Sequence, residues 1–293
     1  MAEALVAIED PAVLPDTVGV RQPRRFTVLF WIAVVWLVLL IALAVFASVL
    51  PLDSPTQVFA CIPNSAPSWH HLLGCDELGR DMLSRIVFGA RVSLEVGFTA
   101  VFIGLVFGGT AGLVAGYFGG KTDLIISSAM NVLLAFPALV LALAVIAFLG
   151  QSLRNVILIL GLLSIAPLAR LVRASTVVYA QREFVTAARM MGFRSRRILF
   201  REVLPNVMPS TLSFAIVAVA VAIVAEGALS FLGLSVRPPA PTWGNMIAEG
   251  STYLSENAWL ALCPAAVLCL TVLALNFAGD GLRSFFDVKD SAL

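Results

Sequence analysis

Apolar residues gather along this chain into long runs rather than alternating with polar residues. A helix needs about 20 apolar residues to cross the hydrocarbon core of a bilayer. Runs of that length predict six transmembrane helices, at approximately residues 26–50, 93–118, 124–149, 154–173, 207–234 and 258–279. The first run is too long for the core of a signal peptide, so we interpret it as a retained anchor. The pattern therefore predicts an all-α integral membrane protein.

The composition places the chain in lipid rather than in water. Of the 293 residues, 60% are hydrophobic and 13% are charged, whereas soluble domains are about 45–50% apolar and about 25% charged. Such a chain cannot cover its surface with polar groups. Long apolar runs also separate the arginines, so no basic face for a nucleic acid is expected.

Basic residues indicate how the chain is oriented across the membrane. Most of the 19 Lys and Arg residues precede the first run, separate the second from the third or the fourth from the fifth, or follow the sixth. Because cytoplasmic loops carry an excess of Lys and Arg, we expect these segments and both termini in the cytoplasm. The chain then divides into an N-terminal tail (1–25), a first transmembrane helix (26–50), an extracytoplasmic loop (51–92), a core of five helices (93–282) and a C-terminal tail (283–293).

Prolines and glycines interrupt several of the runs, among them Pro137, Pro167, Gly108 and Gly112. In lipid they are tolerated because neighbouring helices satisfy the freed backbone groups, and small residues let helices approach closely. We therefore predict a packed bundle whose helices move against one another. The chain has no evident internal repeat, which does not favour an inverted-repeat secondary transporter.

Residues 116–122, GYFGGKT, resemble the end of a phosphate-binding loop. The full pattern requires a glycine where this chain has Ala115. The segment also follows an apolar helix rather than a strand. We therefore expect no ATP site and no other cofactor site in this chain.

The segment between the fourth and fifth runs reads EFVTAARMMGFRSRRILFREVLPN from Glu183. Thr186 to Met191 suits a short helix, and Gly192 is placed as its left-handed cap. A second helical segment is expected from about Ser195 toward Pro205, where the next run starts. Two such helices would form a small rigid protrusion on the cytoplasmic side. The alternative is a basic loop that lies on anionic lipid headgroups.

This segment resembles the cytoplasmic loop shared by permeases of ABC importers, in which E-A-A is followed after three residues by G and later by L-P. The matching residues are Ala187, Ala188, Gly192, Leu204 and Pro205, and Thr186 occupies the position of the Glu. Residues 73–94, 225–246 and 276–287 are similar to motifs of the C-type permeases of oligopeptide, dipeptide and nickel importers. These similarities follow one another in order through most of the chain.

The resemblance implies the type I ABC importer permease (MetI-like) fold, with a coupling loop at about 174–206. It implies a homologous second permease subunit, two subunits or domains that bind ATP and Mg²⁺, and an extracytoplasmic substrate-binding protein. The chain would form half of a translocation pathway for peptides in a bacterial inner membrane. No residue of this chain would then be catalytic.

Two groups of alternatives remain open at this point. Within the family, the solute could be nickel or another small molecule, since the motifs do not separate these substrates. From a different class, a stand-alone channel or ion-driven transporter would need acidic relays in the membrane, for which Glu95 and Glu226 are the candidates. A structural scaffold would show no transport phenotype on deletion.

Charged residues of alternating sign precede the second run at near-helical spacing and predict an interfacial helix linked by salt bridges. A solvated charged face is the alternative. We expect Glu226 to have a structural partner such as Arg91, because charge at membrane depth is costly. Trp243 and Trp259 fit an outer aromatic belt. The family motifs mark these residues as gate or structural candidates: Asp76, Gly79, Arg80, Asp81, Arg85, Arg91, Glu226, Asp280 and Arg283.

The four cysteines form two pairs. Cys263 and Cys269 lie in an apolar run and fit small buried hydrophobes. Cys61 and Cys75 lie in the expected extracytoplasmic loop, where an oxidising compartment permits a disulfide. The alternative is a metal site that uses both cysteines with His70 or His71, but we expect no metal site because no second cluster of ligands supports it.

Overall fold

The computed structural model describes residues 27–290, and within them it is helical, with no strand. The expected tail 1–25 lies outside the described residues. The elements, in chain order, are α1 (Val28–Phe46), α2 (Met82–Phe118), α3 (Gly120–Ala135), α4 (Ala138–Leu149), α5 (Leu153–Ala180), α6 (Glu183–Met190), α7 (Ser195–Ile198), the π-helical turn η1 (Leu199–Val203), α8 (Leu204–Phe231), α9 (Trp243–Ser251) and α10 (Trp259–Asp290).

Long apolar helices dominate the described residues. Five segments are long and apolar enough to cross a membrane: α1, α2, α5, the continuous stretch from α7 to α8, and α10. A sixth span results if α3 and α4 count together, although they are bent by 81°. The bend lies at Phe136 and Pro137, the residues between these helices. The all-helical membrane fold expected from the apolar runs is therefore confirmed.

The closest helix pair in the bundle is α2 and α5, which pack along most of their length. Glycines on one face of α2 permit this approach. A Cβ atom added to Gly108 would lie 2.3 Å from the carbonyl oxygen of Ile165, and one added to Gly112 would lie 2.3 Å from that of Ala169. The small residues thus bring two backbones into contact, as in other membrane helix pairs.

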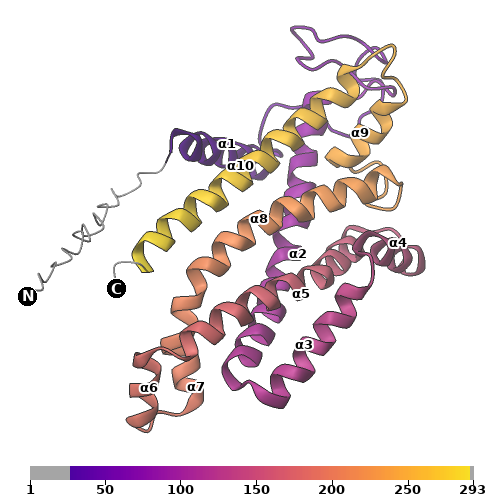
Figure 1. Ribbon diagram of the computed structural model, residues 1–293. Coiled ribbons are helices and arrows are strands. Elements are labelled where there is room, and N and C mark those ends of the chain that lie inside the picture. Colours follow the sequence, from indigo (N-terminus) through magenta and orange to yellow (C-terminus); the bar gives the residue numbers. More distant parts are fainter. Residues whose placement is uncertain (1–26, 291–293) are drawn as a thin grey trace, which may run out of the picture.

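The main core lies where α2, α5, α8 and α10 meet, and Leu94, Leu168, Ile223 and Leu275 are buried there. Helix α1 packs on α10, where Trp36 Nε1 donates to Thr271 Oγ1 at 3.2 Å. Figure 1 shows α6 and α7 at one end of this bundle, with α9 and the segment before α2 at the other.

The expectation of an interfacial helix in the segment before α2 is wrong for Asp76 to Asp81, although Asp76 does form salt bridges with Arg80 and Arg85. Asp76 to Asp81 is not helical: Gly79 takes a left-handed φ of +67°, and Cys75 pairs with Asp81 in an isolated β-bridge. The helix begins at Met82 because the Asp81 carboxylate accepts from the N–H of Ser84 at 2.8 Å. Such a cap satisfies one of the free donors of the first turn.

Trp243 also differs from its expected place in a lipid-facing belt. Its side chain is fully buried, and Nε1 donates to the carbonyl oxygen of Ile86 at 3.1 Å. The indole therefore joins α9 to α2 inside the protein.

Candidate functional site

The segment from Glu183 to Val203, here called the α6–η1 loop, forms a compact protrusion at one end of the bundle (Figure 1). Gly192 follows α6 with a left-handed φ of +76°, and the N–H of Phe193 donates to the Ala188 carbonyl oxygen at 3.2 Å. This is the cap geometry that glycine favours. The π-helical turn η1 then leads directly into α8.

Apolar contacts seat the α6–η1 loop across the ends of three spans. Val185 and Ala188 are buried and cluster with Leu113 of α2, Val172 of α5 and Val207 of α8. The Arg189 guanidinium also lies 5.2 Å from the ring centre of Tyr117 in the last turn of α2. A displacement of the loop would therefore act on α2, α5 and α8 together.

The opposite face of the loop is open. Met190 is 86% exposed and Met191 is 65% exposed. Exposed residues of the family motif include Thr186, Ala187, Gly192 and Pro205, whereas Ala188 is buried and Leu204 is partly buried. Exposed methionines beside arginines make a surface suited to a protein partner, because Met and Arg are enriched in interfaces.

One ion pair lies close to this end of the bundle. Arg173 of α5 binds Asp123 of α3 through two hydrogen bonds, and the one from Nη2 to Oδ2 is 2.6 Å long. The pair links the first turn of α3 to α5. It joins the bent span to the helix on which the α6–η1 loop rests.

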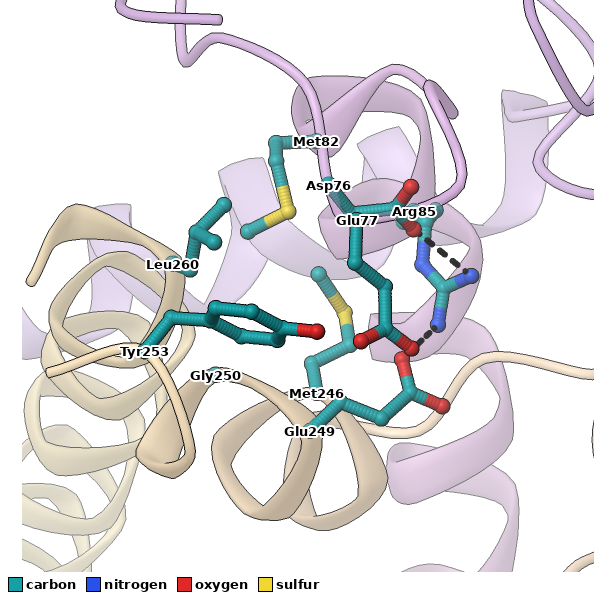
Figure 2. A pocket seen from close by; sticks show the side chains of 9 residues that line it. All are labelled: Asp76, Glu77, Met82, Arg85, Met246, Glu249, Gly250, Tyr253 and Leu260. Carbon is teal, nitrogen blue, oxygen red and sulfur yellow. Dashed lines mark hydrogen bonds and ion pairs between the residues drawn. The ribbon is translucent and has the colours of Figure 1, made fainter. Parts of the chain in front are cut away.

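At the other end of the bundle, the buried residues Asp76, Arg80 and Arg85 pair with one another and with the partly buried Glu249. These four residues are here called the arginine cluster. Asp76 Oδ2 lies 2.5 Å from Arg80 Nε and 3.2 Å from Arg85 Nη1. Glu249 Oε2 lies 2.9 Å from Arg85 Nη2 and 3.2 Å from Arg80 Nη2. Figure 2 shows Arg85 between the two acidic residues. Two arginines and two carboxylates balance the charge, which such burial requires.

Glu249 completes this cluster from α9, and sequence reasoning missed it. Burial raises the pKa of Glu249 above its ordinary value of 4.5, while Arg85 and Arg80 oppose that shift. The partner acid Asp76 is held further by the N–H groups of Leu78 at 2.9 Å and Arg80 at 2.8 Å. The cluster thereby fixes α9 to the segment that precedes α2.

Glu226 does not pair with Arg91, so that expectation is wrong. The carboxylate is fully buried and accepts from the hydroxyls of Ser230 at 2.6 Å, Ser235 at 2.9 Å and Ser93 at 3.3 Å. Arg91 is exposed and donates to Ser48 Oγ at 3.3 Å. The serines satisfy the buried carboxylate without a cation from residues 27–290, and they join α8 to α2 and to the segment before α9.

The other motif residues fall into separate places. Gly79 shapes the turn beside the arginine cluster, and Asp81 caps α2. Asp280 and Arg283 lie exposed on α10, outside both the cluster and the loop. Cys61 and Cys75 are joined in a disulfide in the segment before α2.

An apolar cavity opens beside the bend between α3 and α4. Its walls come from α3, α4, α5 and α8, and they include Phe136, Pro167 and Phe214. A span broken at a proline is tolerated at membrane depth where protein or a cavity surrounds it. Packed spans, a broken span beside a cavity and a loop seated on three helix ends are features that suit a membrane permease.

Residues 108–289 match the family described as "Binding-protein-dependent transport system inner membrane component". The chain belongs to this family and is a multi-pass protein of the bacterial inner membrane. This confirms the resemblance that the sequence motifs indicated.

Three relatives cover most of the chain. The dipeptide transport system permease protein DppC of Alkalihalophilus pseudofirmus is 38% identical, over 88% of this chain and 86% of its own. The glutathione transport system permease protein GsiD of Escherichia coli is 40% identical, over 95% of this chain and 94% of its own. The di/tripeptide transport system permease protein DppC of Pseudomonas aeruginosa is 39% identical, over 87% and 86%.

Solved structures of the inward-facing MetNI methionine ABC transporter share the fold. Two crystal forms match with TM-scores of 0.57 and 0.58, at 21% and 22% identity. Each match covers 68% of this chain and 94% of the other.

Proposed function

We propose that this chain is one permease subunit of an ABC importer for small peptides and that the α6–η1 loop couples it to an ATP-hydrolysing subunit. The observation that carries the proposal is the seating of the loop: one face is buried on three span ends while the other exposes Met190 and Met191. A partner that grips the open face would move α2, α5 and α8 as a unit.

The charge on the loop supports a cytoplasmic position for this end. Its arginines are Arg189, Arg194, Arg196, Arg197 and Arg201, and cytoplasmic loops carry such an excess. The arginine cluster and α9 would then face outward, toward an extracytoplasmic substrate-binding protein. The other half of the pathway would come from a homologous permease subunit.

The names of the relatives support a peptide as the solute. Two of the three relatives transport dipeptides or di/tripeptides, and the third transports glutathione. Each is a short chain of amide-linked residues. We therefore propose di- to tripeptides, including γ-linked ones, as the substrate class.

The coupling role is tested with the complete importer, in which this chain is assembled with its permease, ATPase and binding-protein partners in liposomes. M190E places a charge on the open face of the loop, and we expect it to abolish ATP-dependent uptake and to weaken ATPase binding. The matched control is M190L, which keeps an apolar side chain of similar size at the same exposed position. Normal uptake and assembly by M190E would rule out docking through this face.

The substrate class is tested separately with the wild-type importer. Labelled dipeptide, glutathione and Ni²⁺ are offered at equal concentration, with and without ATP. We expect ATP-dependent uptake of the first two only. Uptake of Ni²⁺ alone would overturn the peptide assignment without touching the coupling role.

A further inference from the structure

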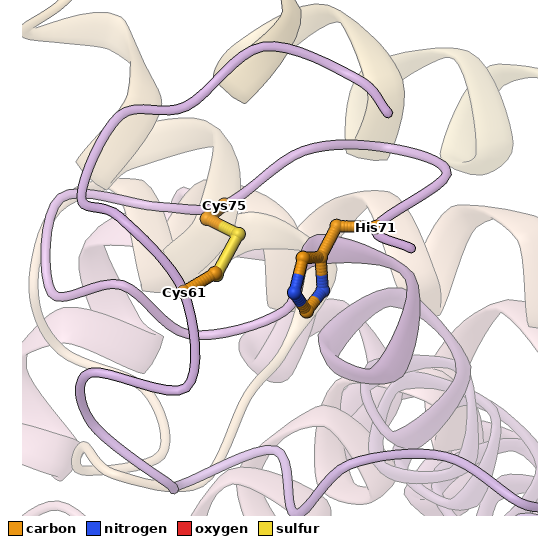
Figure 3. A group of neighbouring side chains, drawn as sticks. All are labelled: Cys61, His71 and Cys75. Atoms are coloured by element: carbon orange, nitrogen blue, oxygen red, sulfur yellow. A yellow bond between two sulfur atoms is a disulfide. The ribbon is translucent and has the colours of Figure 1, made fainter. Parts of the chain in front are cut away.

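A cluster of soft ligand atoms lies in the segment before α2, away from the α6–η1 loop. Cys61 and Cys75 form a disulfide, and their sulfur atoms and a ring nitrogen of His71 all lie within 4.8 Å of one another. Figure 3 shows the ring of His71 turned toward the two cysteines. Cys75 is fully buried, and Cys61 and His71 are partly buried.

Asp81 fixes the orientation of the imidazole. Its Oδ1 lies 3.0 Å from His71 Nδ1, and its Oδ2 accepts from the N–H of Ser84 at 2.8 Å. A carboxylate beside Nδ1 holds the hydrogen on that nitrogen, which leaves Nε2 with a free lone pair. Metal-binding histidines have this arrangement, in which a carboxylate orients the ring.

Backbone hydrogen bonds hold the two cysteines in place independently of the S–S bond. The N–H of Cys61 donates to the Gly79 carbonyl oxygen at 3.2 Å, and that of Cys75 donates to the Ser65 carbonyl oxygen at 3.1 Å. The N–H of Gly74 donates to the His71 carbonyl oxygen at 2.9 Å. The three side chains would therefore stay together if the disulfide were opened.

We propose that the reduced form of this segment binds one Zn²⁺ ion through the thiolates of Cys61 and Cys75 and through His71 Nε2. Two thiolates and an imidazole favour Zn²⁺ over Mg²⁺ or Ca²⁺, which take oxygen ligands. A dithiol reductant supplies two electrons and two protons to the disulfide and becomes a disulfide itself. The metal then displaces the two thiol protons.

Disulfide and metal exclude each other at this site, so it responds to both redox state and zinc. Asp81 contacts His71 and also caps α2. Through Asp81, both the disulfide form and the zinc form of the site are connected to the start of that helix. The sequence did not favour a metal here, because it shows no second cluster of ligands. Only the fold brings Asp81 to within 3.0 Å of His71. The proposal stands independently of the peptide substrate and of the coupling role.

The test uses the purified full chain in detergent with Cys263 and Cys269 replaced by Ala, which leaves the Cys61–Cys75 pair as the only cysteines. The protein is reduced with a dithiol, desalted without oxygen and titrated with Co²⁺ as a coloured substitute for Zn²⁺. We expect one Co²⁺ per chain with a thiolate-to-metal charge-transfer band, bleaching of that band by Zn²⁺, and no band in the oxidised protein.

Variants of His71 and Asp81 distinguish a metal site that uses these side chains from metal binding by the two thiols alone. H71A should weaken Co²⁺ binding at least 10-fold, and D81N should weaken it by about 10- to 100-fold, while Asn still serves as a helix cap. H70A changes the neighbouring exposed histidine and should bind as the wild type does. A reduced protein without the charge-transfer band, or an H71A protein with wild-type affinity, would overturn the proposal.

Discussion

The two ends of the bundle are held together by different forces. At one end, apolar contacts and a cation–π contact seat the α6–η1 loop on three spans. At the other, buried ion pairs join α9 to the segment before α2. Apolar packing is non-directional, so the loop and the three helix ends on which it is seated can move together against the rest of the bundle. Buried ion pairs lose much when one partner is displaced, so the α9 end should behave as the rigid one.

The largest effect is expected when the rigid end loses one of its acids. D76A leaves two buried arginines with one carboxylate and removes the acceptor for two backbone N–H groups. We expect stability to fall by about 3–5 kcal/mol. Thermal unfolding in detergent measures this, and E256A, at an exposed glutamate, is the control. An equal loss of stability in D76A and E256A would show that the ion pairs of the arginine cluster do not stabilise the fold.

A smaller effect is expected from overpacking the seat of the α6–η1 loop. A188L adds a large side chain to a buried position, which costs about 1–3 kcal/mol, whereas A187L changes an exposed neighbour. We expect A188L to increase proteolysis of the loop and to reduce uptake while the rest of the bundle stays folded. Global unfolding by A188L would show that this end is as rigid as the other.

A substitution at Gly192 would strain the backbone of the α6–η1 loop without causing a steric clash. The φ of +76° at Gly192 disfavours side chains, yet nothing lies within 4 Å of an added Cβ atom. G192V should therefore cost about 1–2 kcal/mol locally and lower transport-coupled ATPase activity. The control is G109V, on an open face of α2 without a left-handed φ. Normal coupling in G192V would count against a fixed loop shape.

The smallest effect is expected for E249Q at the rigid end. The raised pKa of Glu249 means that the folded protein binds protons more tightly than the unfolded chain above pH 4.5. Its contribution to stability is therefore fully present below pH 4.5 and declines as pH rises through the raised pKa. Gln mimics the protonated form and lacks this decline.

Unfolding midpoints of the wild type and E249Q, compared from below pH 4.5 to neutral pH, check that expectation. The wild type should lose stability relative to E249Q as pH rises, by about 1 kcal/mol or less. If the wild type instead became more stable relative to E249Q as pH rises, the two arginines would have a larger effect than burial on the pKa of Glu249.

Several features could be predicted because they depend on neighbouring residues only. The length of an apolar run is enough to indicate a span. The cap at Gly192 follows from the glycine after a short helical segment. The bend at Pro137 was less accessible: the proline marks a break in the hydrogen-bond ladder, whereas the angle of 81° depends on how α3 and α4 pack.

The partners of the buried charges could not be predicted in this way. Arg91 and Ser93 are two residues apart, which places them about 200° apart around a helix of 3.6 residues per turn. Ser93 therefore faces Glu226 while Arg91 faces outward. In the same way, Glu249 reaches Arg85 from 164 residues further along the chain.

By itself, the sequence determined the class of the protein, its helical spans and the shape of the α6–η1 loop, because run length, caps and motif spacing are local properties. Only the tertiary structure decided which buried charges meet, that Trp243 lies inside the protein and that His71 faces the cysteines. These contacts join residues whose separation along the chain says nothing of their separation in space, so the packing of α2, α8 and α9 had to be known first.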